Sequence, residues 1–176
     1  LTGLKILDLT QFEAGPSCTE ALAWLGADVV KVENPGSGDP GRSSGRVGPN
    51  DANYFLQYNS NKRSIAVNLK DPRGLETVKN LAKQADVMIE NFAPGAIERL
   101  GLGYEVIKAI NPSIIFCQIK GFGTGSPFET TSANPRTIPI VPNVTINGLI
   151  FSRVIATPLI NPNSPPVKIP TSTPTA

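Results

Sequence analysis

The sequence contains no histidine, and it has only two cysteines, one methionine and one tryptophan among 176 residues. The missing histidine removes the commonest general base and the commonest metal-ligating side chain, so no metal site is expected. The two cysteines, Cys18 and Cys117, cannot form a disulfide framework, which favours a reducing, cytoplasmic compartment. Both lie in apolar periodic segments, so we expect two buried structural thiols.

Long apolar runs and basic clusters are missing too. No apolar run reaches about 18 residues, and no signal peptide is recognisable, so we expect a soluble protein that does not bind a membrane. Aromatic residues make up 6% of the chain and no basic run is present, which argues against nucleic-acid binding. The hydrophobic content of 40% is typical of a globular protein, and the length favours one core.

The composition changes near residue 129. Residues 130–176 hold nine of the seventeen prolines, a single glycine and no acidic residue. We therefore predict an ordered α/β portion over 1–129 and an irregular Pro-rich tail over 130–176. Within the tail, Asn147-Gly148 separates two β-prone triplets, which predicts a hairpin. The rest of the tail is expected to be extended or disordered.

The portion before the tail alternates between strand and helix patterns. The first strand, the helix that follows Gly15-Pro16 and ends at Gly26, and the second strand form a βαβ unit, which predicts a parallel sheet. Asp71-Pro72 is a typical helix start, and Asn34 to Asn53 is predicted as a loop. The predicted strands are 4–9, 28–33, 64–68, 86–90 and 114–120, and further helices are predicted up to Leu100 and over 104–110.

Three local patterns suggest ligand contacts, each with an alternative. Glycine-rich turns follow several strands and could hold a phosphate or be simple turns. Gly36 to Gly41 is interrupted by Pro40 and no helix follows it directly. The first βα turn lacks the G-x-G-x-x-G spacing, which counts against an NAD-dependent enzyme. Lys62 and Arg63 precede a strand and suit a phosphate or a buried carboxylate, or else a solvated turn. Phe92 follows a strand and could stack on an adenine or close the core. The residues alone leave these alternatives open.

Taken in order, the motifs resemble one family. The chain is similar to the N-terminal part of class III CoA-transferases, the group that contains formyl-CoA transferase, carnitine CoA-transferase and α-methylacyl-CoA racemase. The resemblance implies a Rossmann-like α/β fold, with a parallel sheet flanked by helices. It rests on LTGLKILDLT (1–10), AGPSCT (14–19), LGADVVKVE (25–33), GSGD (36–39), NKRSIAVNLK (61–70), ADVMIENFAPG (85–95), RLGLGY (99–104), INP (110–112) and KGFG (120–123).

The resemblance also implies a site for coenzyme A, bound as an acyl-CoA, at the strand ends. Lys70 and Arg99 could meet phosphates, the backbone at 67–69 could meet the adenine edge, and Phe92 offers a flat face. Arg42, Lys62 and Arg63 are lesser candidates. The implied contacts are Glu13, Ala14, Asn34, Val67, Asn68, Leu69, Lys70, Asn91, Phe92, Ala93 and Arg99.

The family chemistry requires residues that this sequence does not supply. In the transferases, an aspartate beyond the KGFG segment attacks the acyl-CoA thioester, and a carboxylic acid finally accepts the CoA. The last aspartate here is Asp86 and the last acid is Glu129, so no catalytic residue is assigned. The racemases use a His/Asp pair, and histidine is absent. We therefore expect a truncated, catalytically incomplete CoA-transferase that keeps the CoA-binding half.

A different class of function remains open beside this one. The chain could be a CoA- or nucleotide-binding or interaction module without catalysis, which needs a second chain to supply the missing half. Members of the family form interlocked homodimers, and the departure at residue 130 puts that assembly in doubt for this chain. CoA affinity combined with activity only after a partner is added would favour the module.

Overall fold

A computed structural model of the chain describes residues 1–45, 52–122, 127, 143–146 and 149–152. In the described part, the strands form one sheet in the order β3-β2-β1-β4-β5-β6-β7. The first five strands along the chain pair in parallel, and β6 and β7 extend the sheet as an antiparallel hairpin. The strands are β1 (Lys5–Leu9), β2 (Asp28–Glu33), β3 (Arg63–Ala66), β4 (Val87–Glu90), β5 (Ile115–Lys120), β6 (Asn143–Ile146) and β7 (Leu149–Ser152).

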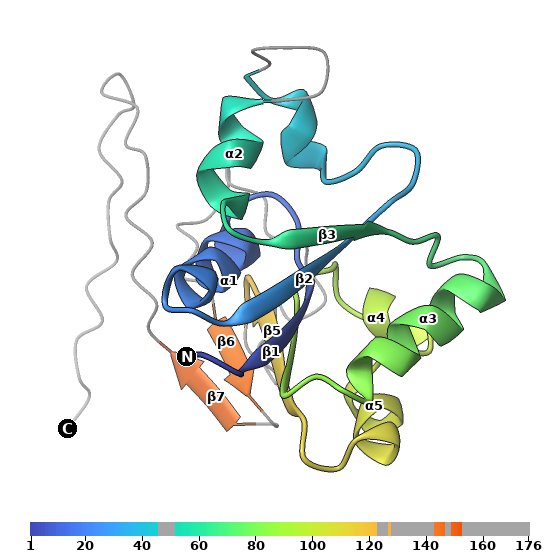
Figure 1. Cartoon of the computed structure of the whole chain (residues 1–176). Helices are drawn as coiled ribbons and strands as arrows, with labels where there is room; N and C mark the ends of the chain where they lie inside the picture. The colour runs from blue at the N-terminus through green and yellow to red at the C-terminus, as the bar shows by residue number, and fades with distance from the viewer. Residues whose placement is uncertain (46–51, 123–126, 128–142, 147–148, 153–176) are drawn as a thin grey trace.

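Helices flank the sheet on both sides. Figure 1 shows α1 on one side, and α3, α4 and α5 together on the other. The predicted fold, a Rossmann-like parallel sheet with flanking helices, is therefore confirmed. The helices are α1 (Ala14–Trp24), the 3₁₀-helix η1 (Pro40–Ser43), α2 (Asn53–Asn59), α3 (Pro72–Ala82), α4 (Ala96–Arg99) and α5 (Tyr104–Ile110).

Local signals explain where several elements begin and end. Asp71 caps α3 by accepting a hydrogen bond from the Arg73 N–H at 2.9 Å, and Pro72 occupies the first turn. Gly26 follows α1 with a φ of 95°, a conformation that glycine adopts without strain. Strand β2 and helix α5 have the bounds that the sequence predicts.

Two predictions were wrong. The segment Asn34 to Asn53 was expected to be a loop, but it contains η1, and α2 begins at its last residue. Cys18 was expected to be buried and is exposed on α1. Cys117 is buried as predicted, and that burial raises the pKa of its thiol to about 12, which suits a structural role.

The tail contributes the hairpin that the sequence predicts. Strands β6 and β7 pair with Ile146 opposite Leu149, and Lys120 of β5 lies opposite Asn143. The turn Asn147-Gly148 and the remainder of the tail prediction, 130–142 and 153–176, lie outside the described residues. The composition boundary at residue 129 stays a prediction.

The sheet packs two apolar clusters, one on each side. On the side of α3, α4 and α5, the larger cluster joins Leu7 and Met88 of the strands to Val78, Ile97 and Ile107 of the helices. On the side of α1, a smaller cluster contains Ile6, Val29 and Ile89 against Ala23. Burial on both faces explains why the strands are nearly continuous apolar runs.

The order of the strands fixes where a ligand can bind. From β1 the chain moves outward through β2 to β3, then returns across the sheet to β4 and β5 on the other side of β1. The direction therefore reverses between β1 and β4, whose last residues, Leu9 and Glu90, are paired. In open α/β sheets, ligands bind outside the carboxyl ends of the strands at such a reversal. None of the helices in the described residues is long and apolar enough to span a bilayer.

Candidate functional site

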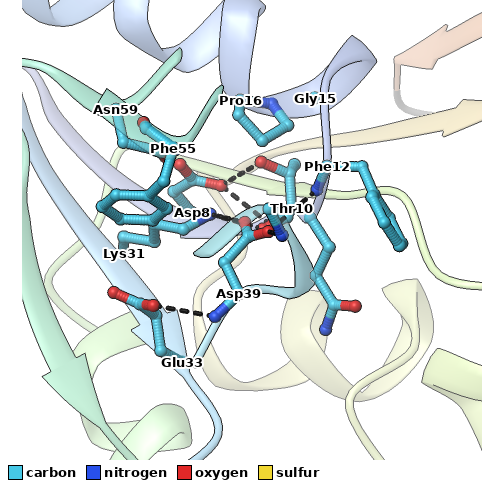
Figure 2. Close-up of polar contacts among 12 residues, drawn as sticks. Asp8, Thr10, Phe12, Gly15, Pro16, Lys31, Glu33, Asp39, Phe55 and Asn59 are labelled. Carbon is cyan, nitrogen blue, oxygen red and sulfur yellow. Dashed lines mark hydrogen bonds and ion pairs between the residues drawn. The ribbon is translucent and has the colours of Figure 1, made fainter. Parts of the chain in front are cut away.

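The turn after β1 is held by buried polar side chains. The carboxylate of Asp8 accepts a hydrogen bond from the Thr10 N–H at 2.8 Å, and the Lys31 ammonium donates to the Thr10 carbonyl at 2.7 Å. Asp8 is 0% exposed and Lys31 is 1% exposed. Figure 2 shows these side chains converging beneath the turn. The backbone of Thr10 is thus fixed from both sides.

Asn91 connects the two strand ends at the reversal point. Its side-chain oxygen accepts from the Gln11 N–H at 2.8 Å, and its side-chain amide donates to the Gln11 carbonyl at 2.8 Å. The side chain of Asn91 thus accepts from and donates to one residue, as the backbone of a neighbouring strand would. Asn91, predicted as a CoA contact, therefore joins the turns after β1 and β4.

Phe12 is the tip of the first turn and has an uncommon backbone. Its φ is 64°, in the left-handed region that bulky residues rarely adopt. Its N–H donates to Asp39 Oδ1 at 3.2 Å, and Asp39 Oδ2 lies 2.8 Å from the Lys31 ammonium. That second oxygen makes no hydrogen bond of good geometry, so its contact with Lys31 is chiefly electrostatic. The ring of Phe12 is 54% exposed and points away from the polar cluster (Figure 2).

A second buried ion pair lies beneath α1. The Lys62 ammonium is 3.2 Å from Asp8 Oδ2, and the Thr19 hydroxyl donates to the same oxygen at 2.6 Å. Burial lowers the pKa of Lys62, and the charge of Asp8 opposes that shift. Of the two ligands suggested for Lys62, the buried carboxylate is the one that it contacts.

Glu33 anchors the loop after β2. Its carboxylate receives two hydrogen bonds from Arg42, at 2.7 and 2.8 Å, one from the Ser64 hydroxyl, and one from the Asp39 N–H at 2.9 Å. Burial by itself would raise the pKa of Glu33, but these donors, chiefly Arg42 and Ser64, lower it to about 2. Arg42 also lies over the ring of Phe55, 3.5 Å from its centroid.

Glu90 has the same role after β4. It is 0% exposed, and it accepts from the Phe92 N–H at 2.7 Å while Lys120 lies 2.6 Å away. Lys120 in turn donates to the Phe92 carbonyl at 2.8 Å. Phe92 is half-buried and packs against the larger apolar cluster. Of the two alternatives for Phe92, closing the core therefore applies to the part of its side chain that is buried.

The predicted contacts after β2 and β3 lie side by side, because these two strands are neighbours in the sheet. The Val67 N–H donates to the Glu33 carbonyl at 2.8 Å, so Val67 to Lys70 follow on directly beside Asn34. Asn34 is exposed and folds a tight turn with its own side chain. Val67 is buried and Leu69 is half-buried, whereas Asn68 and Lys70 are exposed.

Arg99 turns back toward the end of β4. Gly95 has a φ of 71°, and a Cβ placed there would lie 2.8 Å from the Arg99 guanidinium, so the two residues are in close contact. Arg99 and Ala93 are both exposed. The cation is therefore available beside the loop that carries Asn91 and Phe92.

Glu13 and Ala14, at the start of α1, are both exposed. Glu13 contacts α2, because its carboxylate accepts a hydrogen bond from the Tyr54 hydroxyl at 3.2 Å. Burial, and next the charge of Glu13, raise the pKa of Tyr54 to about 12. Glu13 therefore lies on the α2 side of the first turn.

The lesser candidates are occupied by carboxylates. Arg42 binds Glu33, and Lys62 binds Asp8. Arg63 pairs with Asp28 at 2.6 Å, at the amino end of the sheet. Their charges are paired with carboxylates of the chain, which leaves Lys70 and Arg99 as the better phosphate candidates.

Two surface hollows lie at opposite ends of the strands. One, of about 340 Å³, is bordered by Val67, Asn68 and the first turns of α3 at the carboxyl end of β3. The other, of about 250 Å³, is bordered by Lys5, Asp28 and Arg63 at the amino ends. The first lies on the edge where parallel sheets bind ligands.

Sequence reasoning missed the residues that support these turns. Lys31, Asp39 and Glu90 were assigned no role, although they fix residues 10–12 and 92. Lys31 and Glu90 lie inside predicted strands, and a strand pattern does not show which charged residue is buried. The available signal was a charged side chain within a strand expected to be covered on both faces.

Comparison with known proteins accords with this geometry. The family described as CoA-transferase family III matches residues 1–135. The formyl-CoA:oxalate CoA-transferase of Afipia carboxidovorans is 52% identical over 130 residues, which cover 73% of this chain and 30% of that protein. The Escherichia coli O157:H7 enzyme of the same name is 50% identical over 134 residues, 76% of this chain and 32% of that protein. The chain thus spans about a third of the length of these relatives.

Solved structures give the same result. A CAIB/BAIF family protein from Brucella suis superposes with a TM-score of 0.70 at 40% identity, covering 77% of this chain and 37% of that one. A Mycobacterium tuberculosis protein gives a TM-score of 0.70 at 38% identity, covering 76% of this chain and 38% of the other. The fold, the motifs and the family match agree, and the chain belongs to CoA-transferase family III.

Proposed function

We propose that this chain binds the coenzyme A portion of an acyl-CoA at the carboxyl edge of its sheet. The observation that carries the proposal is the convergence of the candidate residues on that edge. Asn34 and Val67–Lys70 follow adjacent strands, and Asn91 links the turns at the reversal point. Two exposed cations, Lys70 and Arg99, suit the phosphates of the nucleotide.

Isothermal titration of the 176-residue chain with CoA tests this proposal, with NAD as the control ligand. We expect saturable binding of CoA and none of NAD. Arg99→Ala and Lys70→Ala should each weaken CoA binding about tenfold, because a charge-assisted contact to a phosphate is lost. Lys83→Ala removes an exposed cation beyond the last turn of α3 and serves as the matched control. A folded sample without CoA binding would contradict the proposal.

The activity that we propose for the complete system is transfer of CoA between an acyl-CoA and a carboxylic acid. The support is the family membership, together with relatives that bear the name formyl-CoA:oxalate CoA-transferase. The family's nucleophile is an aspartate, and this sequence has none beyond Asp86. We therefore expect the chain by itself to bind CoA without transferring it.

The second candidate function is a CoA-binding module that requires another chain. It is supported by the same convergence of candidate CoA contacts at the carboxyl edge, none of which is a catalytic residue. Mixing the chain with a separately produced C-terminal portion of a relative, then assaying transfer from formyl-CoA to oxalate, tests it. Activity only in the mixture would support the module, and CoA binding with an inactive mixture would count against it. A cytoplasmic location stays a prediction, and the interlocked homodimer stays an assembly of the family that is not predicted for this chain.

A further inference from the structure

Phe12 combines two costly features. Among the described residues, only Phe12 and Asn61 have a positive φ without being glycine. Asparagine adopts this conformation readily, whereas a bulky residue such as phenylalanine adopts it only at a cost in energy. The residue also gains little from burial, since Phe12 as a whole is 54% exposed. Stability of the fold alone therefore gives no reason for phenylalanine at this position.

The backbone around Phe12 is nevertheless fixed at every residue. Lys31 holds the Thr10 carbonyl, Asn91 holds both polar groups of Gln11, and Asp39 holds the Phe12 N–H. These anchors come from β2, from the loop before η1 and from the loop after β4. Strain that is maintained by several independent contacts is a feature of binding and catalytic sites.

The surroundings of Phe12 indicate the chemistry of its ligand. The neighbouring Glu13 carboxylate is exposed, and it disfavours a phosphate at this turn. An exposed aromatic ring suits an apolar, uncharged chain of methylene and amide groups. The turn also lies at the reversal point between β1 and β4. Ligands of open α/β sheets bind just outside the strand ends at such a point.

From these observations we infer that Phe12 is a binding residue for the uncharged pantetheine arm of the acyl-CoA, and that its strained backbone holds the ring in place for this contact. The inference rests on the proposed CoA site and adds a residue for a part of the ligand that Lys70 and Arg99 do not recognise. It predicts that stability and affinity change in opposite directions when Phe12 is replaced by glycine.

The test measures thermal unfolding and ligand affinity for Phe12→Gly and Phe12→Ala. Glycine relieves the strain, so the melting temperature of Phe12→Gly should rise by about 3 °C. Both variants should bind CoA about tenfold more weakly, because an aromatic contact of about 1.4 kcal/mol corresponds to a factor of ten. Both should bind 3′-phospho-ADP, which lacks the pantetheine arm, as tightly as the unaltered chain does.

The control is Trp24→Ala, which removes a 68% exposed ring at the other end of α1 and should leave both affinities unchanged. Equal loss for CoA and 3′-phospho-ADP in Phe12→Gly would overturn the inference, because the ring would then serve the nucleotide or the shape of the loop. Unchanged CoA affinity, or a lower melting temperature for the glycine variant, would also overturn it. If the unaltered chain binds neither ligand, the proposed CoA site fails and the inference falls with it.

Discussion

The two sides of the sheet are held by different kinds of contact. On the side of α3, α4 and α5, the interface is the larger apolar cluster, with Val78, Ile97 and Ile107 each 0% exposed. On the side of α1, the apolar cluster is smaller, and Asp8, Lys31 and Lys62 are buried beside it. The apolar side supplies burial energy, whereas the polar side uses oriented contacts that fix the first turn.

This contrast separates stability from binding. Burial of apolar surface is non-directional, so the α3 side can hold the sheet without specifying the orientation of individual backbone groups. Hydrogen bonds are directional, and those of Asp8, Lys31 and Asp39 end on the backbone of residues 10–12. We therefore expect substitutions in the polar network on the α1 side to alter both stability and CoA affinity. Substitutions on the α3 side at core positions outside the candidate CoA contacts, such as Ile107, should alter stability alone.

The largest expected effect follows removal of Asp8. Asp8→Ala leaves the Lys62 ammonium buried without its carboxylate, which should lower the free energy of unfolding by about 3–5 kcal/mol. Adding Lys62→Met to this variant should recover part of the loss, because the unpaired charge is removed. Urea unfolding of the single and double variants measures both values. A loss below about 1 kcal/mol in the single variant would show that the pair is not important for stability.

A substitution on the apolar side should come next. Ile107→Ala creates a cavity under α5 and should cost about 3 kcal/mol of unfolding free energy. The folded variant should keep the CoA affinity of the unaltered chain, since Ile107 lies in α5 and is not one of the candidate CoA contacts. Urea unfolding measures the change in stability, and titration with CoA below the thermal unfolding transition measures the affinity. A matching loss of affinity would remove the distinction between the two sides.

The sequence predicts the apolar side better than the polar side. The bounds of α5 and the cap of α3 follow from local patterns, because apolar spacing and an Asp-Pro start are visible within a few residues. The pairing of Lys31 with Asp39, and of Asp8 with Lys62, depends on how the segments before η1 and before β3 fold back against β1 and β2. No local pattern contains that information.

Helix α2 shows the same limit. It begins at Asn53 after a glycine-rich segment, and its ends carry none of the usual capping signals. It is placed by contacts with α1 and η1, including Tyr54 with Glu13 and Phe55 with Arg42. At the candidate site, the family motifs identify residues on the correct edge, whereas the strained φ of Phe12 is visible only in three dimensions.

A smaller effect is expected from pH, because the free energy of unfolding should depend on the ionisation of Glu33. The pKa of Glu33 is about 2 in the folded chain, below its ordinary value of 4.5. Its ionised form therefore stabilises the fold above about pH 5, and that contribution is lost as the pH falls toward 2. We expect a loss of about 2 kcal/mol over this range, allowing for the partial exposure of Arg42. Urea unfolding at several pH values measures it, and Glu33→Gln should flatten the profile.

The smallest effect is expected for a surface ion pair that belongs to neither the apolar cluster nor the buried polar network. Arg63 and Asp28 form a close contact at the amino end of the sheet, but their side chains are 68% and 47% exposed. Arg63→Ala should change the free energy of unfolding by less than about 1 kcal/mol and leave CoA affinity unchanged. Weaker CoA binding in this variant would move the proposed site to the wrong end of the strands.

Hydrogen exchange of the 176-residue chain with and without CoA tests the central claim most directly. The account predicts that CoA slows exchange of the backbone amides at 10–13, 67–70 and 91–93, at the carboxyl edge. Amides around Lys5, Asp28 and Arg63, at the opposite hollow, should exchange at the same rate in both samples. Protection confined to that opposite hollow, or none at saturating CoA, would contradict the account.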